Sequence, residues 1–200
     1  MKYKLLIVLG VLLLIFLGIK MFKKNNFNTK YQVGQVIDSL HQVKVYYNGG
    51  VSHTAGRNLA SDGYNLGIKY QCVEFVKRYY YEHLHHKMPD TYGNAKDFFN
   101  AELENGAINK QRDLFQYHNG ATIKPKVNDI IVFSKSFWNP YGHVAIIAEV
   151  NVDSITIIQQ NPGPFGESRE QLELRNKEKK YYIDNDRVLG WLTLDSKKTQ

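Results

Sequence analysis

Residues 61–79 read SDGYNLGIKYQCVEFVKRY, and this stretch leads from a loop into a helix. Its first part belongs to a loop that we expect over Asn58 to Ile68, because two glycines interrupt the pattern there. From Gln71 to about Leu84 there is no glycine or proline, and apolar residues recur at helical spacing with charged residues between them. Cys72 therefore stands at the predicted start of a helix, directly after a loop.

A cysteine at the start of a helix has distinct chemistry. Unpaired backbone N–H groups and the positive end of the helix dipole both favour the thiolate form. Cys72 is the single cysteine of the chain, so an intramolecular disulfide is excluded. By its position alone it is as readily a small buried core residue as a nucleophile, and the flanking residues have to decide.

A nucleophilic cysteine needs a histidine that takes its proton, normally from a distant segment. Three of the seven histidines lie at the far end of the predicted cysteine helix and cannot reach its start, namely His83, His85 and His86. Three more lie in polar or irregular sequence, namely His41, His53 and His118. His143 differs, because it follows Tyr141-Gly142 and opens the apolar run Val144 to Ala148. Alone it would be a structural histidine, but it is the best candidate for a base.

A third group should orient the imidazole of His143 through its second nitrogen. We expect paired strands over His143 to Val150 and Ser154 to Ile158, joined by a turn at Asn151 and Asp153. The second strand ends in Gln159-Gln160-Asn161, so these amides can lie beside the histidine.

Other segments complete the expected secondary structure. We expect a short strand over Gln42 to Tyr47, a helix over Asn94 to Leu103, a strand over Ile130 to Phe133 after a turn at Asn128-Asp129, and a last strand over Arg187 to Leu194. Helices come early and strands late, which indicates an α+β fold and not alternating βαβ units.

The N-terminus holds a membrane-length apolar segment. Leu5 to Ile19 is an unbroken apolar run of 15 residues, and Met21 and Phe22 extend it past Lys20. Eighteen residues of helix span about 27 Å, close to the thickness of a bilayer core. No small-residue cleavage site follows, so we favour an uncleaved single-pass anchor over a cleaved signal or a buried helix.

The expected organisation is an anchor at residues 1–24, a polar stalk at 25–40 and one domain at 41–196. Lysines flank both ends of the apolar run, so the positive-inside rule does not fix its orientation. The segment resembles an export signal with a short tail, which places the domain on the extracytoplasmic side.

The formal charge of +7 does not indicate a nucleic-acid partner. Five lysines lie in the first 24 residues, and the remainder carries 21 basic against 19 acidic residues. His83, His85 and His86 have no carboxylates at matching spacing, so we expect a solvated helix end there and no metal.

Residues 61–79 resemble the nucleophile region of CHAP domains (cysteine, histidine-dependent amidohydrolase/peptidase). They are most similar to the amidase domains of glutathionylspermidine synthetase/amidase and trypanothione synthetase, with Gln71 to Phe75 as the specific core. Gly142 to Ile147 resembles the histidine strand of that family. Gln160-Asn161 and Leu189 to Trp191 also match in order and spacing, so the resemblance covers roughly residues 45–194.

The resemblance implies a papain-like fold, in which the cysteine helix packs on an antiparallel sheet that carries the histidine. It implies Cys72 as nucleophile and His143 as base. Gln159 departs from the family, which usually has an acid there, although its oxygen can still accept the imidazole N–H. Asn161 matches a position that the family also uses and is the alternative orienting residue. Lys77 replaces a usual arginine, which puts one substrate contact in doubt.

The implied function is that of a cysteine amidohydrolase or peptidase that works through a thiol acyl-enzyme, without metal or organic cofactor. A domain outside the membrane would meet peptidoglycan peptides, whereas a cytoplasmic one would meet a glutathione–polyamine amide. A third possibility is an inactive CHAP module that only binds wall peptides. The sequence leaves the substrate and the oligomeric state open.

Overall fold

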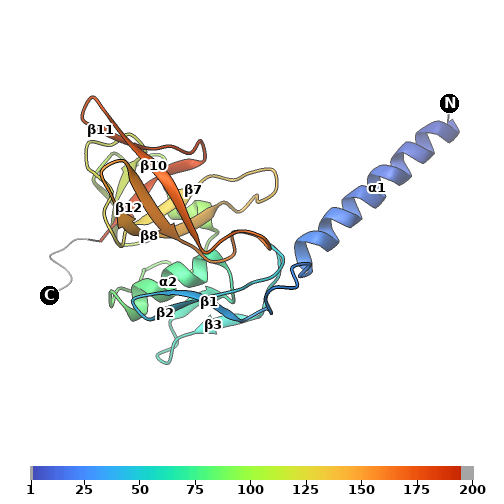
Figure 1. The fold of residues 1–200 in the computed structure, drawn as a ribbon, viewed down its shortest axis with the longest axis horizontal. Helices are drawn as coiled ribbons and strands as arrows, with labels where there is room; N and C mark the ends of the chain where they lie inside the picture. The colour runs from blue at the N-terminus through green and yellow to red at the C-terminus, as the bar shows by residue number, and fades with distance from the viewer. Residues whose placement is uncertain (1, 195–200) are drawn as a thin grey trace.

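The computed structural model describes residues 2–194, which form a long N-terminal helix and an α+β domain (Figure 1). The elements in chain order are α1 (Lys2–Lys24), β1 (Val36–Leu40), β2 (Val43–Tyr46), β3 (Arg57–Leu59), β4 (Asn65–Ile68), α2 (Cys72–Glu82), the 3₁₀ helix η1 (Ala95–Phe98), β5 (Ala107–Asn109), β6 (Leu114–His118), β7 (Ile130–Phe133), β8 (His143–Val150), β9 (Ser154–Ile158), β10 (Arg169–Lys177), β11 (Lys180–Ile183) and β12 (Val188–Thr193).

The domain is built on an eight-stranded antiparallel sheet in the order β11-β10-β9-β8-β7-β12-β6-β5. Its central strands β7 and β8 are buried on both faces, which explains their nearly continuous apolar sequence. Val132 and Val144 contribute to a core on the α2 side, whereas Ile131 and Ala145 contribute to a second core on the opposite side. Successive side chains along one strand thus serve two different cores.

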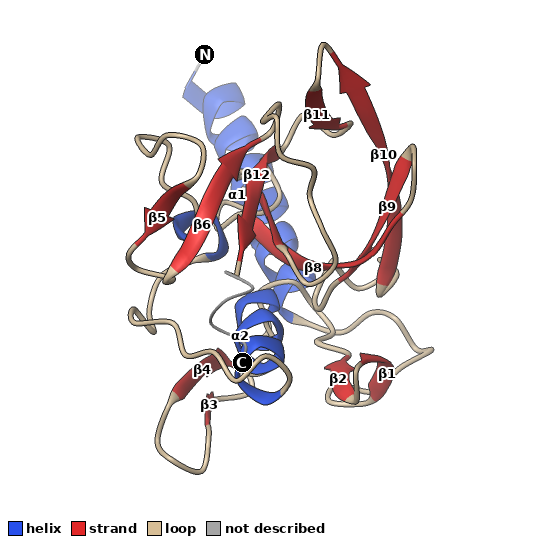
Figure 2. Ribbon diagram, turned by 90° about the vertical axis from the view of Figure 1, so that its left-hand side faces the viewer, coloured by secondary structure: helices blue, strands red, loops and turns tan. Residues whose placement is uncertain are grey.

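Helix α2 lies against β8 and also contacts β2 and β4 (Figure 2). Its apolar residues recur at helical spacing, and Phe75, Val76 and Tyr79 are completely buried between these strands. The register of β7 against β8 pairs Phe133 with His143. This packing brings the first residue of α2 and the first residue of β8 to one end of the helix–sheet interface.

The expected α+β class, the cysteine helix and five strands are confirmed, the strands being β2, β7, β8, β9 and β12. Two other expectations are wrong. The segment Asn58 to Ile68 is a loop only over residues 60–64, because the flanking strands β3 and β4 pair as an irregular hairpin. The helix expected over Asn94 to Leu103 is a single turn, η1. The helix ends there because the Gln116 side chain takes the place of helical partners. The Asn100 N–H donates to the Gln116 Oε1 at 2.9 Å, and the Asn100 oxygen accepts from the Gln116 Nε2 at 2.7 Å.

The structure also contains strands that the sequence patterns did not indicate, namely β1, β5, β6, β10 and β11. Strand β1 lies within the segment expected to be a stalk, residues 25–40, and pairs with β2. The domain bounds 41–196 remain a prediction, and residues 195–196 lie outside the described part of the chain.

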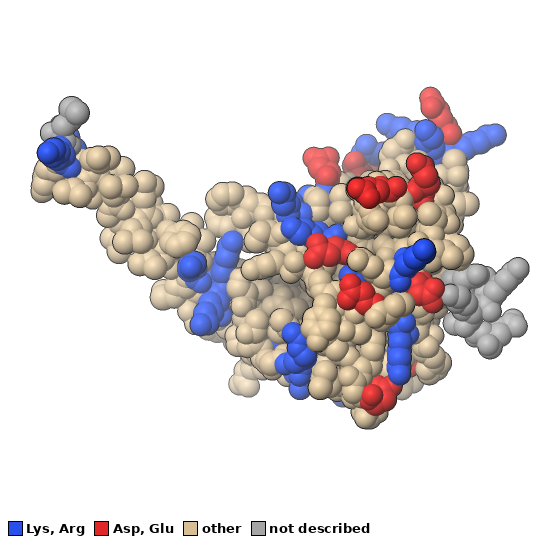
Figure 3. Space-filling view, turned by 180° about the vertical axis from the view of Figure 1, so that it is seen from behind, with Lys and Arg blue, Asp and Glu red and all other residues tan. Residues whose placement is uncertain are grey.

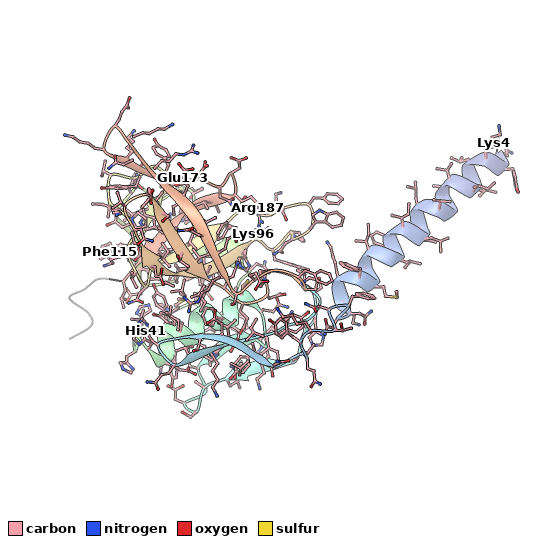
Figure 4. The ribbon with its side chains drawn as sticks, in the orientation of Figure 1. Lys4, His41, Lys96, Phe115, Glu173 and Arg187 are labelled. Atoms are coloured by element: carbon pink, nitrogen blue, oxygen red, sulfur yellow. The ribbon has the colours of Figure 1, made fainter. Side chains whose placement is uncertain are left out.

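Helix α1 is 23 residues long, and none of its side chains is buried. It is long and apolar enough to cross a membrane, a property shared by secretion signals. Its last turn meets the domain, and Lys4 lies at the far end of the helix (Figure 4).

Candidate active site

Cys72 is the first residue of α2, and the chain before it is fixed by hydrogen bonds. Gln71 precedes the helix in an extended conformation, with φ −82° and ψ 160°, and its side chain does not cap the helix. Its Nε2 instead donates to the backbone oxygen of His53 at 2.6 Å and to that of Val51 at 3.3 Å. Gly67 allows the backbone of β4 to pass close to α2, since an added Cβ would lie 3.2 Å from Cα of Glu74.

His143 is the first residue of β8 and is held by the loop before it. Gly142 has φ +75°, and a Cβ there would lie 2.7 Å from the Phe133 oxygen, so a glycine is required at this position. The Asn139 Nδ2 donates to the Gly142 oxygen at 2.7 Å. The backbone N–H of Val144 donates to the Cys72 thiol. The start of β8 therefore lies against the start of α2.

The imidazole of His143 is bonded to Gln159 at the end of β9. The His143 Nε2 and the Gln159 Oε1 are 2.9 Å apart. The Gln159 Nε2 donates to the Glu167 oxygen at 3.2 Å and to the Glu170 carboxylate at 3.3 Å. Because those two partners only accept, the amide oxygen faces the histidine and Nε2 carries the proton. This leaves Nδ1 of His143 as the proton acceptor.

Asn161 lies on the cysteine side of the site and is not bonded to the imidazole. Its Nδ2 donates to the Val51 oxygen at 2.9 Å and to the Gln71 Oε1 at 2.7 Å. It has a left-handed backbone, with φ 58°, and its Oδ1 is buried without a hydrogen-bond partner among residues 2–194. Asn161 therefore supports Gln71, the residue before the cysteine, whereas Gln159 contacts the histidine.

Burial controls the protonation of the Cys72–His143 pair. It raises the pKa of the Cys72 thiol to about 11, although the N–H groups of Val144, Val73 and Cys72 act in the opposite direction. It lowers the pKa of His143 to about 4; the Gln159 hydrogen bond raises this pKa and the charge of Arg187, labelled in Figure 4, lowers it further.

This result differs from the expectation that the helix start favours a thiolate. Both side chains are almost completely buried, and the loss of hydration outweighs the helix N-terminus. Burial thus shifts both pKa values in the direction that favours a neutral thiol and a neutral imidazole.

A cleft of about 440 Å³ opens over Cys72. Gln71 and Asn161 line it near the cysteine, and Arg57 and Tyr92 line another part. The Arg57 guanidinium lies 5.4 Å from the centre of the Tyr92 ring. Arg57 is the charged member of this lining, which contains no carboxylate among the described residues.

Lys77 does not line the cleft. It is buried, and its Nζ donates to the backbone oxygens of Asn65 and Thr91. Burial lowers the pKa of Lys77 to about 8. Lys77 therefore cannot make the substrate contact that the sequence put in doubt.

Residues 2–194 contain no group of three or more His, Cys, Asp or Glu side chains that could hold a metal ion. Two of the three histidines beyond α2 have other partners. His86 bonds to the Arg112 oxygen at 2.9 Å, and His83 stacks on His41 at 4.1 Å.

The family model of the CHAP domain matches residues 61–161, from the turn before β4 through Cys72 and His143 to the Gln159–Asn161 segment. The chain belongs to the CHAP family. The chain is 29% identical over 119 residues to the trypanothione synthetase of Crithidia fasciculata, and this alignment covers 60% of this chain and 18% of that protein.

Two further relatives are similar to this chain at comparable identity. The bifunctional glutathionylspermidine synthetase/amidase of Escherichia coli strain K12 is 27% identical over 147 residues, 68% of this chain and 23% of that protein. The endolysin PlyTW of Staphylococcus phage Twort is 28% identical over 96 residues, 46% of this chain and 19% of that protein. The chain thus spans about a fifth of each relative. These likenesses support a peptidase or amidase of the CHAP type.

The CHAP site includes residues that the sequence did not single out. Glu170 belongs to β10, a strand with no clear sequence signal, and reaches the site through Gln159. Asn139 supports Gly142 from a loop, and Arg57 reaches the cleft from β3. Only Asn139 had a local signal, because Asn-Pro before Tyr-Gly indicates a turn next to the histidine.

Proposed function

We propose that this chain is a membrane-anchored cysteine amidase or peptidase that cleaves amide bonds in cell-wall peptides. The observation that carries the proposal is the arrangement of Cys72 and His143 at one end of the α2–β8 interface, with Gln159 bonded to the far nitrogen of the imidazole. A cysteine at a helix start beside a histidine on an antiparallel strand also supports the papain-like arrangement implied by the sequence.

The first step is the attack of sulfur on the amide carbonyl. Because the resting pair is neutral, Nδ1 of His143 takes the thiol proton as the sulfur forms its bond to the carbonyl carbon. The Cys72 sulfur accepts hydrogen bonds from backbone N–H groups at the start of α2. The backbone N–H of Cys72 is placed to donate a hydrogen bond to the developing oxyanion. Gln159 stabilises the imidazolium through its oxygen.

The second step breaks the carbon–nitrogen bond. The His143 imidazolium gives its proton to the leaving amine, and a thioester remains on Cys72. Water, deprotonated by His143, then attacks the thioester and releases the carboxylic acid, and the thiol regains its proton. No metal or organic cofactor enters this sequence.

The properties of the cleft and of α1 favour wall peptides as the substrate. A polyamine carries several positive charges that need carboxylate partners, whereas the lining carries Arg57 and no carboxylate among the described residues. Stem peptides and cross-bridges contain the carboxylates that an arginine binds. Helix α1 is suited to hold the domain outside the membrane, where such peptides occur, and the endolysin is a relative of the domain.

The direct test is to incubate the full chain, in mild detergent, with purified peptidoglycan or with glutathionylspermidine. New amino groups are quantified, and the products are identified by mass spectrometry. We expect release of amines from peptidoglycan alone, and none with Cys72→Ala or His143→Ala chains that remain folded. Cleavage of glutathionylspermidine alone would favour the polyamine alternative. Peptidoglycan binding without cleavage by the unmodified chain would favour an inactive binding module.

A further inference from the structure

The wall of the cleft begins where α1 ends. The backbone N–H of Ser52 donates to the oxygen of Lys23 in the last turn of α1, at 2.8 Å. Gly50 lies so close that an added Cβ would be 2.5 Å from the same oxygen. Val51 and Ser52 both line the cleft. The cleft is therefore attached directly to the end of the apolar helix.

Large aromatic side chains are exposed around this junction. Phe137 is 85% exposed and Trp138 is 62% exposed, at the tip of the loop that leads to His143. Phe27 and Phe165 are exposed as well. We refer to these four residues as the aromatic rim. Exposed aromatic side chains that gather in one region usually mark a contact surface.

Each segment of the rim is tied to the end of α1. The Phe27 ring stacks on Phe22 of α1 at 5.1 Å. The Nζ of Lys23 lies 5.7 Å from the centre of the Trp138 ring. The chain before Phe165 is fixed to the same junction, because the Pro164 oxygen accepts a hydrogen bond from the Asn28 Nδ2 at 2.7 Å.

Basic side chains accompany the rim. Lys23, Lys24 and Lys30 belong to the same junction, and Lys and Arg side chains gather where α1 joins the domain (Figure 3). Glu167 is an acidic neighbour and interacts with Lys30. Aromatic rings favour the interface between the hydrocarbon and water, and lysines at that level bind anionic headgroups. The end of a membrane helix lies at this same depth.

We propose that the aromatic rim inserts into the interfacial region of the membrane that α1 spans and thereby holds the cleft at the membrane surface. This inference rests on the anchor of the proposed function, which it deepens. The loop of Phe137 and Trp138 also supplies Asn139, Tyr141 and Gly142 to the cleft. The substrate is then a peptide or amide presented next to the lipid surface, not one in the distant layers of the wall.

The two tryptophans of the chain provide the measurement. Trp138 is exposed, whereas Trp191 is completely buried in the sheet core. We reconstitute the full chain in vesicles of phosphatidylcholine and phosphatidylglycerol, with or without brominated acyl chains that quench nearby tryptophan. Bromolipid should remove most of the Trp138 emission, obtained as the difference between the unmodified chain and Trp138→Phe. It should leave the emission of the Trp138→Phe chain unchanged.

A matched control moves the tryptophan to the other end of β8. Val152 is 93% exposed in the β8–β9 turn, about 25 Å along the strand from His143. Val152→Trp in the Trp138→Phe chain should be quenched by aqueous acrylamide and not by bromolipid.

The outcomes separate this inference from the catalytic proposal, because no readout depends on cleavage. A chain that floats with the vesicles but shows acrylamide quenching and no bromolipid quenching of Trp138 overturns the inference and leaves the anchor intact. Protection of Trp138 by soluble wall peptide, without lipid quenching, would make the rim a substrate surface. A chain that does not float overturns the anchor and the inference together.

Discussion

Gln159 occupies a position where the CHAP resemblance leads one to expect an acid, and its two polar atoms have different partners. The oxygen accepts the proton of His143, and the amino group donates to Glu170 at 3.3 Å. A neutral amide stabilises an imidazolium less than a carboxylate does. The Glu170 carboxylate therefore contacts the amide and not the imidazole, and burial lowers the pKa of His143 to about 4 despite the Gln159 hydrogen bond.

Replacing Gln159 with Glu should raise the pKa of His143 above its value of about 4, because an adjacent anion favours the imidazolium. His143 must be neutral to take the proton, so the acidic limb of the kcat/KM–pH profile should move to higher pH. The double change Gln159→Glu/Glu170→Gln keeps an amide–carboxylate hydrogen bond and removes the repulsion between two acids. It should show the same shift with more activity. An unmoved acidic limb would mean that His143 is not the base.

Gln159→Ala and Asn161→Ala should have different effects on the kinetics, because only Gln159 contacts the imidazole. Loss of the group that orients the base should lower kcat about 10- to 1000-fold. Asn161→Ala removes support from Gln71 and not from the imidazole, so it should leave the position of the acidic limb unchanged. Full activity of Gln159→Ala combined with loss of activity in Asn161→Ala would reverse the two roles.

The raised pKa of Cys72 predicts slow alkylation of the substrate-free protein at neutral pH. The thiolate is the reactive form, and its fraction rises about tenfold per pH unit until the pKa of about 11 is approached. Iodoacetamide labelling, followed by mass spectrometry, should therefore be slower than that of a free thiol at pH 7 and should accelerate steadily with pH. Rapid labelling below pH 7 would instead reveal a thiolate–imidazolium pair.

At the scale of secondary structure, Gln160 links the end of β9 to α2 and β2. Its Nε2 donates to the Glu74 carboxylate of α2 at 2.7 Å and to the Gln71 oxygen at 3.0 Å, and its oxygen accepts the Tyr46 N–H of β2 at 2.8 Å. Glu74 is buried and paired with Arg78 at 2.6 Å. The end of β9 thus fixes both the start of the cysteine helix and the strand beside it.

Gln160→Ala should lower the free energy of unfolding by about 2–4 kcal/mol, because it leaves buried polar groups without partners at about 1–3 kcal/mol each. Urea unfolding of the full chain in mild detergent measures the change. Gln171→Ala, at an exposed position of β10, is the matched control and should stay within about 0.5 kcal/mol. Equal stability of both variants would show that the Gln160 network does not join the elements.

The whole molecule combines an apolar helix with a domain whose cleft adjoins the end of that helix. If α1 anchors the domain outside the membrane, protease added to intact cells should remove the domain and leave a membrane-bound stub. Antibodies against the two ends of the chain detect the two parts. Digestion that occurs only after lysis would place the domain in the cytoplasm and favour the glutathione–polyamine substrate.

The sequence by itself determined the elements whose signal is local. The apolar length of residues 5–19, the glycine-free run after Gln71 and the apolar strand after His143 each follow from short-range periodicity. The cysteine motif was sufficient to indicate the family, which the match to residues 61–161 shows. The candidate residues could therefore be named before their positions in space were known.

Tertiary structure decided what depends on partners far along the chain. Gln159, and not Asn161, reaches His143, because the backbone of Asn161 turns its side chain toward Val51 and Gln71. Strand β10 brings Glu170 to the site, although its charged sequence gives little sign of a strand. Helix-start effects favour a thiolate at Cys72, but burial between α2 and β8 removes hydration and reverses the preference. Hydration and long-range hydrogen bonds depend on packing, and no local pattern encodes them.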